Sequence, residues 1–203
     1  MRKLFYLFSL VVSLNSFGQI DAVNDNMPSI NGYTGNSNVG NVLSNDTLNS
    51  VPVSSTQIVI TVVTPANPVW PGSPVPLVNP ATGVVTVNPG TPAGTYTITY
   101  QICEIANPNN CDQATVTVSV TAGWIDAVND SGNPTTSMGG VAFTNVIIND
   151  TFNGAPVVPS QVTITMVSST NPGVTLSGYN VVVAPGTPAG NHTLTYQICE
   201  LLN

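Results

Sequence analysis

The chain has 203 residues, of which only 5% are charged, and its nine acidic and two basic residues give a formal net charge of −7. Both basic residues, Arg2 and Lys3, stand at the N-terminus, so the rest of the chain carries carboxylates without any lysine or arginine. Binding to nucleic acid or to anionic lipid depends on clustered cations, so the composition excludes both functions.

Residues 1–18 have the layout of a secretory signal peptide. The two basic residues precede an apolar run, Leu4–Leu14, and small residues for cleavage follow at Ser16 and Gly18. The apolar run is about half of the roughly 20 residues that a membrane-spanning helix needs. We therefore expect a secreted or cell-surface protein whose mature chain has no membrane span.

The remainder of the chain consists of two sequence repeats. Residues 20–25 (IDAVND) recur as residues 125–130, and residues 89–94 (PGTPAG) recur as residues 185–190. The offset shortens between these two blocks, so the first copy carries about eight extra residues. We expect this insertion in the Pro-rich stretch 65–80 around Trp70.

Each repeat has about 100 residues, which is an ordinary size for a domain. The sequence therefore predicts one domain at residues 19–122 and a second at residues 123–203.

Within the first repeat the apolar residues follow the two-residue period of β-strands. Short strands are predicted at residues 57–63, 84–87, 95–103 and 113–120. The buried faces of the last two are expected to carry Tyr96, Ile98, Tyr100, Ile102, Ala114, Val116, Val118 and Val120. Gly, Pro and Asn clusters separate the strands, and no segment has a sustained helical period. The pattern predicts an all-β fold of tandem immunoglobulin-like antiparallel sandwiches, the second one truncated.

The cysteines indicate how the last hairpin is held. Cys103 and Cys111 flank the loop between the two final strands of the first repeat, and in an exported chain we expect them to form a disulfide. A metal or redox pair is the alternative, which the spacing disfavours. Cys199 matches Cys103, and its partner would fall beyond residue 203. We therefore expect the second repeat to lack its last strand and the chain to be a fragment of a longer repeat protein; a regulatory lone cysteine is the alternative.

The carboxylates recur at matched positions in the two repeats. In a sandwich, the first strand and the last hairpin loop share one pole. One cluster is therefore expected at that pole of each repeat: Asp21, Asp25, Glu104 and Asp112 in the first, Asp126, Asp130 and Glu200 in the second. Asp46, the counterpart of Asp150, is expected at the opposite pole, where it would approach the second cluster across the domain junction.

Oxygen-rich clusters without cationic partners favour hard cations, and calcium takes six to eight oxygen ligands. The candidate calcium ligands are Asp21, Asp25, Asp46, Glu104, Asp112, Asp126, Asp130, Asp150 and Glu200. The segment Asp21–Pro28 resembles the inter-domain calcium linker of cadherins, with one extra residue between the first Asp and the Asn. The alternative is that these Asp and Asn residues only cap turns.

Several blocks resemble the bacterial Ig-like or cadherin-like repeats of very large surface adhesins, including those exported by a type IX system. They are AVND at residues 22–25, VLSNDT at 42–47, GTYTITYQICE at 94–104 and NPNNCD at 107–112. The resemblance implies a stalk or adhesive module, with surface glycans or other cell-surface proteins as partners. It also implies a C-terminal sorting domain, which this sequence lacks.

The sequence predicts no enzyme. His192 is the only histidine and takes the position of Tyr96 in the other repeat. Paired carboxylates can hydrolyse glycosides, but here the pairs recur in each repeat, and a catalytic site need not be duplicated.

The alternative function is a carbohydrate-binding accessory module of a secreted enzyme. In this interpretation Trp70, in the insertion, and Tyr33, in a Gly- and Asn-rich loop, would stack on sugar rings. Trp124 is expected to pack between the repeats.

Overall fold

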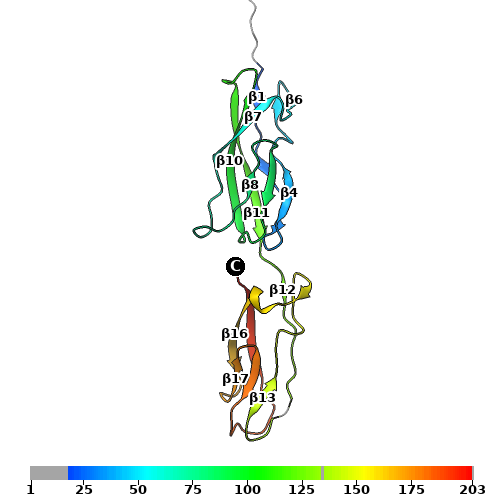
Figure 1. The fold of residues 1–203 in the computed structure, drawn as a ribbon, viewed down its shortest axis with the longest axis vertical. Helices are drawn as coiled ribbons and strands as arrows, with labels where there is room; N and C mark the ends of the chain where they lie inside the picture. The colour runs from blue at the N-terminus through cyan, green and yellow to red at the C-terminus, as the bar shows by residue number, and fades with distance from the viewer. Residues whose placement is uncertain (1–17, 134, 203) are drawn as a thin grey trace, which may run out of the picture.

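The computed structural model describes residues 18–133 and 135–202, so nearly all of the predicted signal peptide lies outside the described residues. The fold is all-β, with antiparallel sheets, as predicted. We call residues 18–122 the first module and residues 123–202 the second module, because no strand of one pairs with a strand of the other. Figure 1 shows the two modules end to end.

The first module contains two main sheets. One has the order β2-β11-β10-β7, with β3 also paired to β11, and the other has the order β4-β9-β8. Three short strands, β1, β5 and β6, form a further small sheet. The bounds are β1 Ile20–Asp21, β2 Asp25–Asn26, β3 Ile30–Asn31, β4 Asn36–Asn41, β5 Thr47–Leu48, β6 Val51–Pro52, β7 Ile58–Thr64, β8 Leu77–Val78, β9 Val84–Val87, β10 Gly94–Glu104 and β11 Cys111–Thr121.

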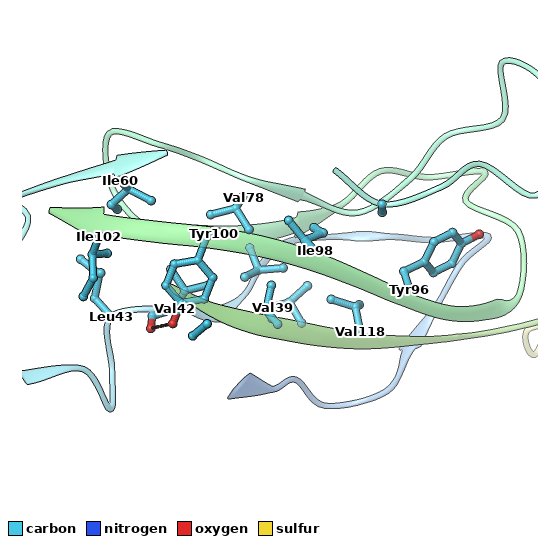
Figure 2. Packing of buried hydrophobic residues seen from close by; sticks show 14 of the residues in the cluster. Val39, Val42, Leu43, Ile60, Val78, Tyr96, Ile98, Tyr100, Ile102 and Val118 are labelled. Atoms are coloured by element: carbon cyan, nitrogen blue, oxygen red, sulfur yellow. Dashed lines mark hydrogen bonds between the residues drawn. The ribbon is translucent and has the colours of Figure 1, made fainter. Parts of the chain in front are cut away.

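The predicted alternation on β10 and β11 is confirmed. The eight residues expected to point inward on these strands are all buried, at 5% exposure or less. Figure 2 shows several of them near Val39 and Val78 of the other sheet and near Val42, which directly follows β4. Burial of this apolar face is the main force that holds the two sheets together.

The β10–β11 hairpin is closed by the predicted disulfide. Cys103 and Cys111 lie directly opposite each other in the strand register, and their sulfur atoms are bonded. The prediction of this bridge is confirmed. Cys199, the equivalent residue of the second module, is an exposed free thiol.

The second module repeats this plan with fewer paired strands. Its strands are β12 Ile125–Asp126, β13 Gly140–Phe143, β14 Thr151–Phe152, β15 Ala155–Pro156, β16 Val162–Ser169, β17 Val174–Ser177, β18 Asn180–Val183 and β19 Leu194–Glu200, with one short 3-10 turn at Pro159–Gln161. They form the sheets β12-β14-β15, β13-β18-β17 and β16-β19.

The insertion in the first module lies between β7 and β8. Residues 65–76 connect these two strands, whereas residues 170–173 connect their counterparts β16 and β17. The extra residues of the first copy are therefore in the predicted Pro-rich stretch, and Trp70 lies within them. No helix in the described part of the chain is long and apolar enough to cross a membrane.

Candidate functional site

The most unusual chemical feature of the first module is a pair of buried carboxylates that share one tyrosine. Asp25 is 6% exposed and Asp46 is 1% exposed, and Tyr100 is completely buried beside them. The Tyr100 hydroxyl lies 3.0 Å from Oδ2 of Asp25 and 3.3 Å from each carboxylate oxygen of Asp46. It also lies 3.1 Å from the carbonyl oxygen of Val42. One hydroxyl proton therefore faces several acceptor oxygens.

Backbone geometry brings the two carboxylates together. Asp25 lies in β2, which pairs in parallel with β11 next to β10, the strand that carries Tyr100. Asp46 precedes β5, and the backbone N–H of Val23 donates a hydrogen bond of 2.7 Å to its Oδ1. The side-chain amide of Asn45 donates to the carbonyls of Val23 and Asn24. These bonds tie the segment before β2 to the turn that carries Asp46.

The environment disfavours the charged forms of this cluster. Burial raises the pKa of Asp25 to about 6, with repulsion from Asp46 adding to the shift and the hydrogen bond from Tyr100 opposing it. Burial also raises the pKa of Asp46, against a hydrogen bond from the backbone of Val23. The pKa of Tyr100 lies well above its ordinary value, because of burial first and of the two neighbouring carboxylates second.

The second module contains the same arrangement. The Tyr196 hydroxyl lies 3.0 Å from Oδ2 of Asp130 and 2.9 Å from the carbonyl oxygen of Val146. The backbone N–H of Val128 donates a hydrogen bond of 2.6 Å to Oδ1 of Asp150. Burial raises the pKa of Asp150. Asp25 and Asp46, like their counterparts Asp130 and Asp150, therefore anchor internal contacts of their modules.

This geometry corrects one prediction. Asp46 does not lie at the opposite pole of its module from Asp25, because both contact Tyr100. It also does not reach across the junction to Asp126, Asp130 and Glu200. The turn that carries Asp46 is hydrogen-bonded to the segment before β2, a tertiary contact that strand periodicity does not reveal.

Other acids of the first module lie around its N-terminal segment, as expected. Oδ2 of Asp112 accepts a hydrogen bond of 2.9 Å from the backbone of Ala22, and Oε2 of Glu104 accepts one of 2.9 Å from Asn110. Asp21, in β1, contributes to the electrostatic environment of Asp46, as does Asp112. Among the described residues, no group of three or more His, Cys, Asp or Glu side chains is arranged to hold a metal ion.

The described contacts between the two modules are made by uncharged side chains. The ring of Tyr33 packs edge-on against Phe152, with centroids 4.6 Å apart, and its hydroxyl accepts a hydrogen bond of 2.6 Å from Gln161. The side-chain amide of Asn31 donates to Oδ1 of Asn153 at 2.8 Å. These contacts fix one module against the other.

Tyr33, Trp70 and Trp124 differ in how far they are buried and in where they lie. Tyr33 is partly buried in the junction, where it joins the apolar cluster of the second module. Trp70 is 43% exposed on the insertion loop, and Trp124 is 63% exposed. The expectation that Trp124 packs between the modules is therefore wrong, and Tyr33 takes that role. The backbone of Trp124 exchanges hydrogen bonds with Asn153.

His192 takes the same position as Tyr96. Its Nε2 lies 2.9 Å from the carbonyl oxygen of Pro188, and the Tyr96 hydroxyl donates to the carbonyl oxygen of Pro92 at 2.8 Å. Both side chains thus brace the loop that the PGTPAG block forms. This hydrogen-bond contact of His192 holds the loop in place, as the Tyr96 contact does in the first module.

Comparison with known proteins gives a similarity of fold only. No protein-family model matches the chain, and no curated protein matches it. The chain is similar, at low TM-scores, to solved cadherin ectodomains, and it spans less than half the length of the Desmocollin-1 and Protocadherin Gamma B2 chains. The human Desmocollin-1 ectodomain has a TM-score of 0.38 at 13% identity, over 82% of this chain and 34% of that one.

Two further solved structures are similar to the same degree. Protocadherin Gamma B2 extracellular cadherin domains 3-6 have a TM-score of 0.37 at 10% identity, over 89% of this chain and 47% of that one. Human CDH23 EC21-23 has a TM-score of 0.36 at 17% identity, over 82% of this chain and 61% of that one. At these scores the likeness carries no argument about ligand, metal or partner.

Proposed function

We propose that this chain is a non-catalytic, extracellular repeat segment that serves as the stalk or an adhesive part of a cell-surface protein. The observation that carries the proposal is the junction, where Tyr33, Phe152 and Gln161 hold two repeated β-modules end to end. A stalk needs such contacts because they keep successive modules from folding back on each other. The signal-like N-terminus and the resemblance to adhesin repeats support the same function.

Surface labelling and adhesion of the producing cells test the proposal. An antibody against residues 19–203 is expected to label intact cells, and external protease is expected to remove the label. Deletion of both modules from the full-length protein is expected to lower adhesion while the protein still reaches the surface. Labelling that requires cell lysis, or adhesion that is unchanged by the deletion, would count against this function.

Carbohydrate binding is the second candidate, and the exposure of Trp70 favours it. This indole lies on a loop that the second module lacks, and aromatic faces of this kind bury large apolar areas on contact. Tyr33 is not included, because the junction occupies its ring. A glycan array should show binding that Trp70→Ala abolishes and that Trp124→Ala, a change at another exposed tryptophan, preserves. If the array shows no binding, carbohydrate binding is removed as a candidate and the stalk function remains.

Calcium belongs to the proposal in a narrower form. The buried carboxylates already contact tyrosine hydroxyls and backbone N–H groups, so the remaining candidates in the first module are Asp21, Glu104 and Asp112. The structure does not gather these three around one point, so binding is expected only at the millimolar affinity of weak extracellular sites. A thermal midpoint that is unchanged by EDTA and by added calcium would remove calcium from the proposal.

A further inference from the structure

A small hollow on the surface of the first module lies between the segments that follow β4 and β6 and the turn before β9. It has a volume of about 350 Å³ and is open to solvent. That volume is at the lower end of the roughly 300–1,000 Å³ that small-molecule sites occupy. No charged residue lines the hollow, and its walls include Leu43, Ser44, Val53, Ser54, Ser55 and Thr82.

The second module fills the corresponding place with one of its own side chains. The carbonyls of Gly83 and Tyr179 accept matched backbone hydrogen bonds, so these two residues hold equivalent positions. The Tyr179 ring packs against the apolar cluster of the second module, and its hydroxyl donates to the carbonyl oxygen of Pro159 at 3.2 Å. Pro159 is the counterpart of Ser55. The tyrosine side chain therefore spans the place that is hollow in the first module.

The first module cannot fill the hollow from the same position. Gly83 has a φ of 75°, and a Cβ atom there would lie 2.5 Å from Oδ1 of Asn41. The Asn41 side chain is fixed, because it donates to the carbonyl oxygen of Thr82 at 2.8 Å and accepts from the backbone of Leu43 at 2.9 Å. Only glycine fits at such a close approach. The hollow is therefore kept free of a side chain at that position.

The walls of the hollow are more polar than their counterparts in the second module. Three positions change from aliphatic to hydroxyl side chains: Ile148, Val158 and Pro159 in the second module are Ser44, Ser54 and Ser55 in the first. In the described part of the chain, the hydroxyls of Ser44 and Ser55 are exposed and make no hydrogen bond. Leu43 and Val53 add an apolar part to the same hollow. A ligand with both hydroxyl groups and an apolar face matches these walls.

We propose that this hollow binds one neutral pyranose ring of a carbohydrate. The phenol of Tyr179 shows that a six-membered ring with a hydroxyl group fits this place in the fold. The serine hydroxyls would bond to hydroxyl groups of the sugar, and its C–H face would contact Leu43 and Val53. Nine carboxylates and no cation after residue 3 disfavour an anionic sugar. Trp70 does not line the hollow, so this site is separate from the one that an exposed tryptophan would form.

A titration of the isotope-labelled chain, followed by NMR, tests the site. The probes are the methyl glycosides of glucose, galactose and mannose, glucuronic acid as an anionic sugar, and p-cresol as the analogue of a tyrosine side chain. We expect at least one neutral glycoside to shift the backbone amide signals of residues 43–44 and 53–55. The dissociation constant should be about 1–10 mM, because so small a ligand makes few contacts. Glucuronic acid and p-cresol should bind more weakly.

Two sets of substitutions locate the binding in the hollow. The triple variant Ser44→Ile, Ser54→Val, Ser55→Pro introduces the residues that the second module carries on the same backbone, and it should bind at least about tenfold more weakly. The double variant Ser44→Ala, Ser55→Ala removes only exposed hydroxyls and so keeps the fold; it should bind about three- to tenfold more weakly. Ser37→Val, at an exposed position of β4 outside the hollow, should bind like the parent chain.

Three results would overturn the proposal. One is the absence of shifts in the hollow with all three neutral glycosides, including shifts confined to residues 65–76. Another is unchanged binding by the Ser44→Ala, Ser55→Ala variant. The last is tighter binding of p-cresol than of any glycoside, which would assign the hollow to an aromatic side chain. Trp70→Ala should leave binding in the hollow unchanged. None of these outcomes bears on surface location or adhesion, so the test is independent of the stalk function.

Discussion

A single tyrosine hydroxyl organises the buried carboxylates of each module. In the first module the Tyr100 hydroxyl has one proton to donate, yet oxygens of Asp25, Asp46 and Val42 surround it. No lysine or arginine exists after residue 3 to neutralise these acids. Burial disfavours the charged form and raises the pKa of both carboxyl groups, and a proton on one of them would supply the missing donor.

Removal of this hydroxyl should therefore destabilise the first module at neutral pH. Tyr100→Phe leaves two buried carboxylates without their shared donor, and we expect a loss of about 1–3 kcal/mol in the free energy of unfolding. Tyr196→Phe should cost less, because the second cluster is more open to water. Urea denaturation of both variants measures the difference. Equal stability of Tyr100→Phe and the parent chain would show that the hydroxyl does not hold the cluster.

The raised pKa values also predict an unusual pH dependence. The carboxyl of Asp25 titrates at about 6 in the folded chain and at about 4 when unfolded, so the folded state holds more protons between these values. The contribution of this carboxyl group to the free energy of unfolding is therefore fully present below pH 4 and is lost as the pH rises through 6. Urea midpoints should fall from pH 4 to pH 7 and then level off.

Two variants separate this effect from general charge repulsion. Asp25→Asn should flatten the profile, because it removes the titrating group. Asp21→Asn, which removes an exposed charge in β1 that is a minor contributor to the raised pKa of Asp46, should keep most of the slope of the parent chain. A parent chain that becomes more stable between pH 4.5 and pH 7 would contradict the prediction.

At the scale of secondary structure, the β5–β6 and β14–β15 hairpins, which occupy equivalent positions in the two modules, give a natural comparison. The β5–β6 turn places Asn49 and Ser50 at φ of 57° and 63°, and the β14–β15 turn places Asn153 and Gly154 at 51° and 77°. Positive φ at both central residues is the geometry of the two-residue turns that match strand twist. Asn and Gly tolerate this region, whereas Ser does so at a cost.

Exchanging Ser and Gly at the second central position of the two turns should therefore change the stability of the two modules in opposite directions. Ser50→Gly is expected to stabilise the first module by about 0.5–1 kcal/mol, and Gly154→Ser to destabilise the second by a similar amount. Thermal unfolding followed by circular dichroism measures both shifts. If Ser50→Gly lowers the midpoint, its side chain makes a favourable contact that outweighs the backbone strain.

The disulfide acts on the β10–β11 hairpin, which carries eight of the eighteen buried residues of the first core. The double variant Cys103→Ser, Cys111→Ser should lose about 2.5 kcal/mol, the value that the chain-entropy treatment gives for so short a loop. Denaturation of oxidised and reduced parent chain provides the matched measurement. Cys199→Ser breaks no bridge in the described chain and should leave the midpoint unchanged.

At the scale of the whole molecule, Tyr33 couples the two modules. Its ring packs on Phe152, and its hydroxyl accepts a hydrogen bond from Gln161. Tyr33→Ala should lower the stability of the second module by about 1–2 kcal/mol, less than for a fully buried aromatic residue. Calorimetry is expected to show that the melting transitions of the two modules separate. Trp70→Ala, a change at an exposed aromatic residue of the same module, should leave the trace unchanged.

Much of the fold follows from local pattern, and much of the site does not. The alternation along residues 95–103 predicted which side chains of β10 are buried, and the spacing of Cys103 and Cys111 predicted their bridge. The predicted position of Asp46 was wrong, because its actual position depends on a turn that folds back on the segment before β2. The role of Tyr33 was also missed. The Asn-Gly turn at Asn153 was a usable signal for a hairpin near the junction, but not for its partner.

The sequence by itself determined the all-β class, the duplication, the site of the insertion and the absence of cations to pair with the acids. These properties are local or compositional, and strand periodicity and residue counts record them directly. Only the tertiary structure decided that Asp25 and Asp46 share Tyr100 and that Tyr33 joins the modules. Those outcomes depend on which distant segments pack together, and packing is set by the free energy of the whole core rather than by any single stretch of residues.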